Sequence, residues 1–238
     1  LHRLFLRKSV IMQRNIYNQL LRWKNKKTRK PLILNGARQV GKTYILREFG
    51  QKEYQKVAFF SLDRDQKVRE VFEKSGSTAD ILMALSAISQ VDITPGDTLL
   101  VLDEIQDCPK ALEALKFFCE ETPDIHIVVA GSLLGLSLHD GTSYPVGKVE
   151  EMRLYPMTFL EFLNAMGKTQ LVEIIENKKW AVVNMLQMEL IGLLRQYYYV
   201  GGMPAAVLAH VEHNSLQEIR SIQLQILADY RRDFSKHA

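Results

Sequence analysis

One run of residues combines two glycines with a lysine and a threonine, the types needed to hold phosphate groups. The run consists of Gly36, Ala37, Arg38, Gln39, Val40, Gly41, Lys42 and Thr43. It matches the pattern GxxxxGK[ST], in which backbone N–H groups surround an anion and the lysine adds a positive charge. The threonine hydroxyl is a hard oxygen ligand suited to magnesium. We therefore predict a site for the phosphates of a nucleotide, with Tyr44 at its downstream end.

A second feature is a pair of acids, Asp103 and Glu104, directly after the apolar residues 99–102. Asp103 is predicted to hold magnesium together with Thr43, and Glu104 to accept the proton of an attacking water. An apolar run that ends in Asp-Glu is also a common strand terminus, but its pairing with the phosphate loop favours the chemical interpretation. The sequence lacks the Asn-Lys-x-Asp string of guanine-binding proteins, so the predicted cofactors are ATP and Mg²⁺.

These residues need a scaffold that brings the loop and the acids together. Short apolar runs without alternation predict strands buried on both faces, as in a parallel sheet covered by helices. The predicted strands are residues 32–34, 57–60, 99–102, 125–130 and 149–154, and the predicted helices between and before them are 13–23, 44–49, 80–89, 111–119 and 133–138. From residue 158 onward only helical patterns remain, at 159–165, 170–176, 180–198 and 216–234.

The predicted fold class is therefore α/β, a P-loop NTPase with a parallel sheet between helices, followed by a small helical lid. We divide the chain into an N-terminal extension (1–12), a P-loop ATPase core (13–157), and a lid that leads into a truncated C-terminal region (158–238).

Composition limits the remaining classes of protein. The two cysteines, Cys108 and Cys119, form no zinc-binding or disulfide-rich pattern. No apolar stretch approaches the length that crosses a bilayer, so we expect no membrane partner and a cytoplasmic protein. The net charge is only +4, yet basic residues cluster before Pro31, where they either contact nucleic acid or form a solvated turn, and the second reading is favoured. These residues are Arg22, Lys24, Lys26, Lys27, Arg29 and Lys30.

Taken with later segments, the chain resembles an AAA-type ATPase family of bacteria and archaea that carries an uncharacterised C-terminal domain. That family is related to signalling and origin-recognition (Orc/Cdc6-like) ATPases. The likeness runs from about residue 13 to the end and rests on residues 35–43, 102–106, 130–135, 144–149 and 154–159. It implies an extra strand between the strand of the phosphate loop and the acidic strand. It also implies a sensor at Ser132 that contacts the γ-phosphate or the lytic water, although Gly-Ser at that point is equally a generic turn.

The resemblance also bears on assembly and on the lid. Relatives carry an arginine that reaches a neighbouring subunit, where this chain has Lys148, so Lys148 or Arg153 is the candidate finger of a homo-oligomer. Residues 201–204 resemble a lid motif whose proline, here Pro204, lies near adenine, although they equally describe a helix break. Residues 229–234 precede a further domain in relatives, so we expect a missing C-terminal region that meets a DNA or protein partner.

The predicted function is a Mg-ATP-binding ATPase that hydrolyses ATP to ADP and phosphate and acts as a nucleotide-dependent switch or motor. The predicted catalytic residues are Lys42, Glu104 and Ser132. The alternative is an ATP-binding signalling or regulatory module with little hydrolysis of its own, which contacts DNA through the basic segment.

Overall fold

The computed structural model describes residues 12–132 and 144–237 of the chain, and these fall into two compact units. The α/β unit is Ile16–Leu154, and the helical unit combines the segment up to Asn15 with Tyr155–Ala238. The chain thus passes between the units twice, at residues 15–16 and again at 154–155. The helix predicted at residues 133–138 lies outside the described residues.

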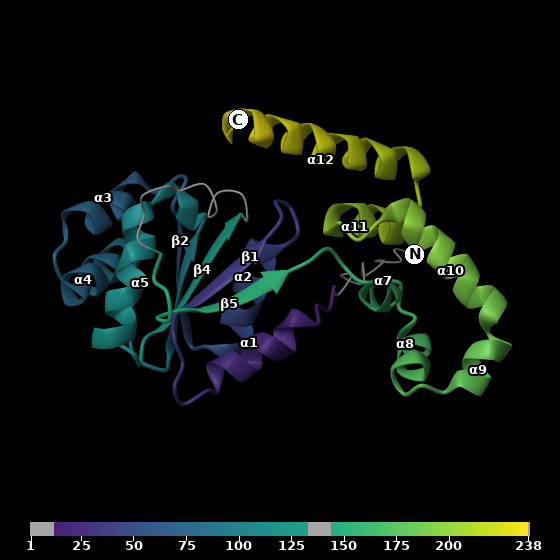
Figure 1. The fold of residues 1–238 in the computed structure, drawn as a ribbon, viewed down its shortest axis with the longest axis horizontal. Helices are drawn as coiled ribbons and strands as arrows, with labels where there is room; N and C mark the ends of the chain where they lie inside the picture. The colour runs from purple at the N-terminus through teal and green to yellow at the C-terminus, as the bar shows by residue number, and fades with distance from the viewer. Residues whose placement is uncertain (1–11, 133–143, 238) are drawn as a thin grey trace, which may run out of the picture. The chain divides into compact units, whose positions relative to one another are not determined.

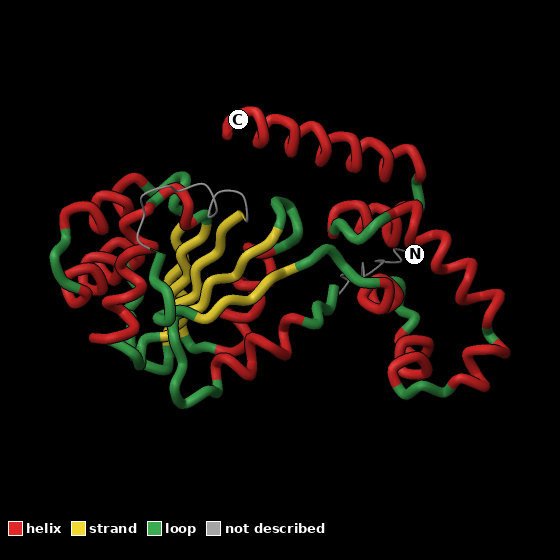
Figure 2. Tube along the Cα trace, in the orientation of Figure 1, coloured by secondary structure: helices red, strands yellow, loops and turns green. Residues whose placement is uncertain are grey.

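The α/β unit is built on a five-stranded sheet in the order β2-β3-β4-β1-β5 (Figures 1 and 2). All four neighbouring pairs run parallel. Because β4 separates β1 from β3, the extra strand implied by the family resemblance is present, and the predicted α/β fold class is confirmed. The strands are β1 (Leu32–Gly36), β2 (Lys56–Ser61), β3 (Thr98–Asp103), β4 (His126–Ser132) and β5 (Glu150–Leu154).

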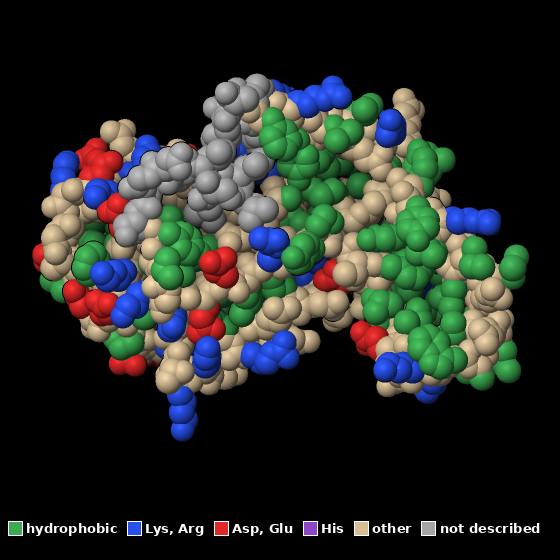
Figure 3. Space-filling view, viewed as in Figure 1, with side chains coloured by type: hydrophobic (Ala, Val, Ile, Leu, Met, Phe, Trp, Pro, Cys, Tyr) green, Lys and Arg blue, Asp and Glu red, His purple; other side chains and the backbone are tan. Residues whose placement is uncertain are grey.

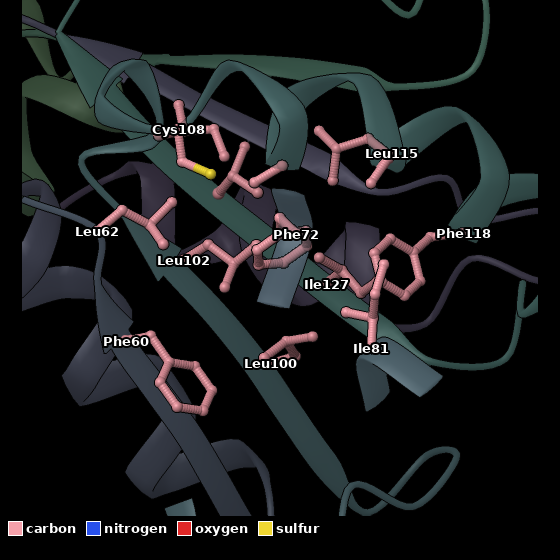
Figure 4. Close-up of a cluster of buried hydrophobic side chains, with 14 of the residues drawn as sticks. Phe60, Leu62, Phe72, Ile81, Leu100, Leu102, Cys108, Leu115, Phe118 and Ile127 are labelled. Atoms are coloured by element: carbon pink, nitrogen blue, oxygen red, sulfur yellow. The ribbon is translucent and has the colours of Figure 1, made fainter. Parts of the chain in front are cut away.

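Helices cover both faces of this sheet because successive strand side chains point to opposite sides. Figure 1 shows α3, α4 and α5 over one face, and Figure 4 shows the core beneath them, which includes Phe60, Leu102 and Phe118. The other face packs its own core, which includes Leu34 and Val101, under α1 and α2. The helices are α1 (Ile16–Lys24), α2 (Lys42–Glu53), α3 (Gln66–Lys74), α4 (Thr78–Ser89) and α5 (Pro109–Glu121).

Two features of these helices differ from the sequence prediction. Helix α3 was not predicted, because only Val68 and Phe72 of its nine residues are buried and the rest of the segment is strongly polar. Helix α4 begins at Thr78, two residues before its predicted start, and is capped by Ser77, whose hydroxyl accepts from the Asp80 N–H. Helix α5 begins at Pro109, two residues before its predicted start, since proline suits the first helical turn.

The helical unit contains α7 (Phe159–Ala165), α8 (Thr169–Glu176), α9 (Trp180–Met185), α10 (Gln187–Val200), α11 (Pro204–His213) and α12 (Leu216–His237). The single helix predicted at 180–198 is wrong, because the chain breaks at Leu186 into α9 and α10. Helix α11 was also not predicted; the Gly-Gly-Met-Pro segment that reads as a break is the start of a new helix with proline in its first turn. Hydrophobic side chains gather on the face of this unit seen in Figure 3, and Trp180, Met185 and Met188 are exposed.

A buried charge network fixes the N-terminal segment to the start of α7 within the helical unit. Arg14 Nε donates to Glu161 Oε1 at 3.2 Å, and the side chains of both residues are 5% exposed. The same carboxylate accepts from the Asn15 and Thr158 N–H groups at 2.7 and 2.8 Å, the second bond completing a capping box. Arg14 also donates to the Tyr155 carbonyl, so Arg14 ties together the two segments that lead into the α/β unit.

Replacing Glu161 by alanine should lower the free energy of unfolding by about 3 kcal/mol, because the Arg14 guanidinium would be left buried without its counter-charge. Urea unfolding followed by circular dichroism measures this loss. The matched control is Glu189→Ala, since its pair with Lys168 is exposed and should be worth no more than about 1 kcal/mol. Equal losses in the two variants would contradict the role given to the buried network.

Candidate functional site

The predicted phosphate loop connects the carboxyl end of β1 to the start of α2, and its glycines are required there for steric reasons. A Cβ at Gly36 would lie 2.5 Å from the Leu154 carbonyl oxygen, so no larger residue fits without moving β5. Gly41, at φ 98°, occupies a backbone conformation that residues with a side chain rarely adopt. Val40 is fully buried beneath the loop, while Ala37 and Gln39 are exposed. Gln39 also has a positive φ of 61°, which marks local strain in the loop.

Lys42 lies inside this loop and contacts the loop backbone. Its Nζ donates to the Gly36 and Ala37 carbonyl oxygens at 2.9 and 3.0 Å. Burial lowers the pKa of Lys42, and the nearby carboxylates of Glu104 and Asp103 oppose that change. The ammonium group is therefore held by two uncharged carbonyl oxygens. The charged oxygens of a phosphate are stronger acceptors and would take their place.

The loop and the acidic strand meet directly at Thr43 and Asp103. Thr43 Oγ1 donates to Asp103 Oδ2 at 2.6 Å, and Asp103 is 3% exposed. Burial raises the pKa of Asp103, and the Thr43 hydrogen bond works in the opposite direction. Residues 60 positions apart in the sequence thus share one site, as the predicted pairing requires.

The Thr43–Asp103 pair has the chemistry of a magnesium site that a nucleotide completes. Both donors are hard oxygens, and Mg²⁺ in phosphate-binding sites takes only one or two ligands from the protein and the rest from water and phosphate. In the described parts of the chain, no group of three or more His, Cys, Asp or Glu side chains is arranged to hold a metal ion by itself. Thr43 and Asp103 would supply two of the ligands, and the phosphate chain and water the others.

Glu104 faces a cavity of about 410 Å³ that lies over the loop. Its backbone is left-handed (φ 55°, ψ 50°), a costly conformation for a non-glycine residue, at the point where β3 turns into a short 3-10 helix, η1 (Ile105–Asp107). The Gln106 side chain donates from Nε2 to Glu104 Oε2 at 2.6 Å. The turn and the amide together fix the Glu104 carboxylate in place. The cavity is lined by Arg38, Gln39, Gly41, Lys42, Thr43, Tyr44, Asp63, Glu104, Gln106 and Asp107.

Three of these lining residues were not found by sequence reasoning: Asp63, Gln106 and Asp107. Asp63 follows β2, whose end pairs with the end of β3, so the parallel register brings it beside the predicted acids. Burial raises the pKa of Asp107, and the charges of Glu104 and Asp63 add to that rise. Asp63 could have been predicted as a site residue, because it follows a predicted strand and the carboxyl ends of parallel strands lie at the same edge of the sheet.

The remaining predicted residues divide into those near the loop and those elsewhere. Ser132, at the end of β4, is 7% exposed and lies in register with Gly36 of β1. Lys148 pairs with Glu120 of α5 at 2.8 Å and precedes β5, at the edge of the sheet opposite to the phosphate loop. Arg153 is exposed on β5. Pro204 belongs to the helical unit, so its contact with a nucleotide stays a prediction.

Sequence comparison places this site within a known family. A family model described as an AAA domain matches residues 28–163, more than half of the 238 residues. The chain belongs to this AAA domain family. A second model, a domain of unknown function (DUF8612), matches residues 191–238 of the same chain. The resemblance to AAA-type ATPases with an uncharacterised C-terminal domain is therefore confirmed, and membership supports a nucleotide-binding role for the AAA domain.

Solved structures agree with this AAA fold. A Walker-type ATPase of Pyrococcus abyssi superposes with a TM-score of 0.56 at 15% identity over 95% of this chain and 77% of its own. The Drosophila ORC bound to DNA gives 0.49 at 14% over 89% of this chain and 66% of its own. The Orc1 protein of Aeropyrum pernix in complex with DNA gives 0.45 at 15% over 93% and 68%. At such identities the first likeness shows the fold alone, and the other two carry no argument. No curated protein matches the chain in sequence.

The basic segment of the AAA domain is largely engaged within the domain itself. Lys24 pairs with Glu53 at 3.6 Å, Lys26 pairs with Glu150 at 3.0 Å, and Lys30 donates to the Gly147 carbonyl at 2.6 Å. These contacts favour the reading of a solvated turn over that of a nucleic-acid surface. In the residues that the structure describes, no helix is both long and apolar enough to span a membrane.

Near this segment, the AAA domain buries a histidine whose protonation should affect stability. The Tyr54 hydroxyl contacts His126 Nδ1 at 2.7 Å, and burial lowers the pKa of His126 to about 4. Because the unfolded chain takes up the proton from about pH 6.5 downward while the folded chain resists it, stability should fall between pH 6.5 and 4, by at most about 3 kcal/mol. Urea unfolding as a function of pH tests this against His126→Gln. The expected difference is a flatter pH dependence in the variant, and parallel curves would contradict it.

Proposed function

We propose that this AAA domain is a magnesium-dependent ATPase that cleaves ATP to ADP and phosphate and works as a nucleotide-dependent switch or motor. The observation that carries the proposal is the 2.6 Å hydrogen bond between Thr43 and Asp103. It joins the phosphate loop to the acidic strand under a cavity that Lys42 and Glu104 also line. Membership of the AAA domain family supports the same reading.

Different residues of the site bind the phosphates and the ion. Lys42 releases the Gly36 and Ala37 carbonyls and turns its ammonium group to the phosphates, while the loop N–H groups donate to the same oxygens. Thr43 Oγ1 and Asp103 Oδ2, which are hydrogen-bonded to each other, would hold the ion directly or through water. Mg²⁺, when bound, neutralises phosphate charge and orients the phosphate chain. Tyr44 lines the outer part of the cavity beside the loop.

Hydrolysis transfers the γ-phosphoryl group to water. The water oxygen bonds to the γ-phosphorus, the bond from that phosphorus to the bridging oxygen breaks with its electron pair left on ADP, and Glu104 accepts the water proton. Gln106 acts as a positioning residue, because its amide holds the Glu104 carboxylate at 2.6 Å. Ser132, beside Gly36 in the sheet, supplies a hydroxyl for the γ-phosphate or the water.

The two parts of the chain have different roles in this proposal. Residues 13–157 form the catalytic core, and residues 158–238 form a helical lid that includes Pro204. The lid reports the nucleotide state to a DNA or protein partner, or to a second copy of the chain. Apolar side chains are exposed on α9 and α10, which supports a contact between the helical unit and such a partner.

Two measurements on the purified chain test the proposal. Calorimetry should show binding of ATP and ADP that is tighter with Mg²⁺ and clearly weaker for GTP, and a phosphate-release assay should show turnover only with Mg²⁺. Binding without turnover at any protein concentration would favour the regulatory module with little hydrolysis. A chain that binds neither ATP nor ADP would refute the nucleotide site.

A further inference from the structure

The charges around the cavity are unbalanced for a ligand with several negative charges. Asp63, Glu104 and Asp107 line the cavity, and Asp103 lies beside it, bonded to Thr43. Among the lining residues that the structure describes, only Lys42 and Arg38 carry a positive charge. Lys42 offsets only part of the repulsion that these acids exert on a triphosphate, and Arg38 would add a second positive charge beside that of the Mg²⁺ ion.

Arg38 is placed to supply that charge. It is the third residue of the phosphate loop, between Ala37 and Gln39, and its side chain is half-buried against the cavity while both neighbours are exposed. Its guanidinium also lies close enough to Lys42 and Asp107 to lower the pKa of each. Arg38 thus lies near both the phosphate-binding lysine and Asp107 of η1.

The other candidates for a finger are less suitable within this chain. Lys148 already pairs with Glu120 and lies at the opposite edge of the sheet, and Arg153 is exposed on β5. Neither residue lines the cavity. An arginine is also better suited than lysine to the transferring phosphoryl group, because its planar fork matches charge that is spread over several oxygens.

We propose that Arg38 is a catalytic residue that contacts the γ-phosphate from within its own chain and stabilises the charge of the phosphoryl group during transfer. This inference rests on the proposed ATPase function. The domain carries its own arginine in the phosphate loop and does not depend on a neighbouring subunit for that charge.

The test compares Arg38→Ala and Arg38→Lys with the wild-type chain and with Arg22→Ala, an exposed arginine of α1 outside the cavity. In Arg38→Ala, kcat for ATP should fall at least about a hundredfold. This fall should be smaller than the one that follows the loss of a complete arginine finger, because Lys42 remains. Affinity for ADP with aluminium fluoride, which mimics the transferring phosphoryl group, should fall at least about tenfold more than affinity for ADP. Arg38→Lys should give intermediate losses, since it keeps the charge without the fork.

Mixing distinguishes action within one chain from action between chains. Arg38→Ala mixed with Glu104→Gln should remain inactive, because each site lacks one of its own groups. Recovered turnover in the mixture would overturn the proposal, as would an Arg38→Ala variant with kcat and aluminium fluoride affinity within about threefold of the wild type. An equal loss for ADP and for the aluminium fluoride complex would also overturn it. If the wild-type chain itself binds no ATP, the proposed function fails, which is a separate result from any effect of Arg38.

Discussion

Replacing Lys42 by alanine is expected to weaken ATP binding at least about a hundredfold, which corresponds to about 2.7 kcal/mol. Lys42 is 6% exposed, and its ammonium group lies inside the loop that is to surround the phosphates. Its removal leaves Arg38 as the one positively charged side chain among the described residues that line the cavity, against three acids. Calorimetry with ATP and with ADP in the presence of Mg²⁺ measures the change.

The matched control for this prediction is Lys52→Ala, because Lys52 is an exposed lysine of the same helix, α2, paired with Glu48. That variant should bind ATP with unchanged affinity. Both variants should unfold in a single transition at similar urea concentrations, which separates lost binding from lost folding. If Lys42→Ala binds ATP as well as Lys52→Ala does, then the loop is not a phosphate site.

Replacing Glu104 by glutamine is expected to lower kcat for ATP by about 10²–10⁴ while leaving ATP affinity nearly unchanged. Glutamine has the same shape as glutamate, but its amide cannot accept the water proton. The backbone turn at Glu104 and the neighbouring Gln106 should be preserved, since an amide oxygen still accepts from Gln106 Nε2. Phosphate release under saturating ATP and calorimetry on the same sample separate turnover from binding.

The control for Glu104 is Glu113→Gln on α5, where the carboxylate pairs with Lys110 at 2.8 Å outside the cavity. That variant should hydrolyse ATP at the wild-type rate. Full turnover in Glu104→Gln would remove Glu104 from the role of base and would direct attention to Asp107 or Asp63, the other carboxylates on the cavity wall. Glu104→Gln that traps ATP also provides the partner for the mixing experiment with Arg38→Ala.

Much of the α/β unit could be predicted because its strands are apolar without alternation, as burial on both faces requires. The five predicted strands match β1 to β5 to within a few residues at their ends. The helix predictions were wrong where a helix buries few side chains, or where no strong local signal marks the break between two helices. Helix α3 buries only Val68 and Phe72, and the break at Leu186 between α9 and α10 has neither glycine nor proline.

By itself, the sequence determined which residues can hold a phosphate chain. The loop at 36–43 and the acids at 103–104 carry their chemistry in residue type and spacing, and the strands before them follow from local hydrophobicity. The tertiary structure alone decided which other groups face that loop: Asp63 after β2, Gln106 beside Glu104, and a half-buried Arg38. The physical reason is that strand order and register bring segments far apart in the chain to one edge of the sheet, and no local pattern encodes that order.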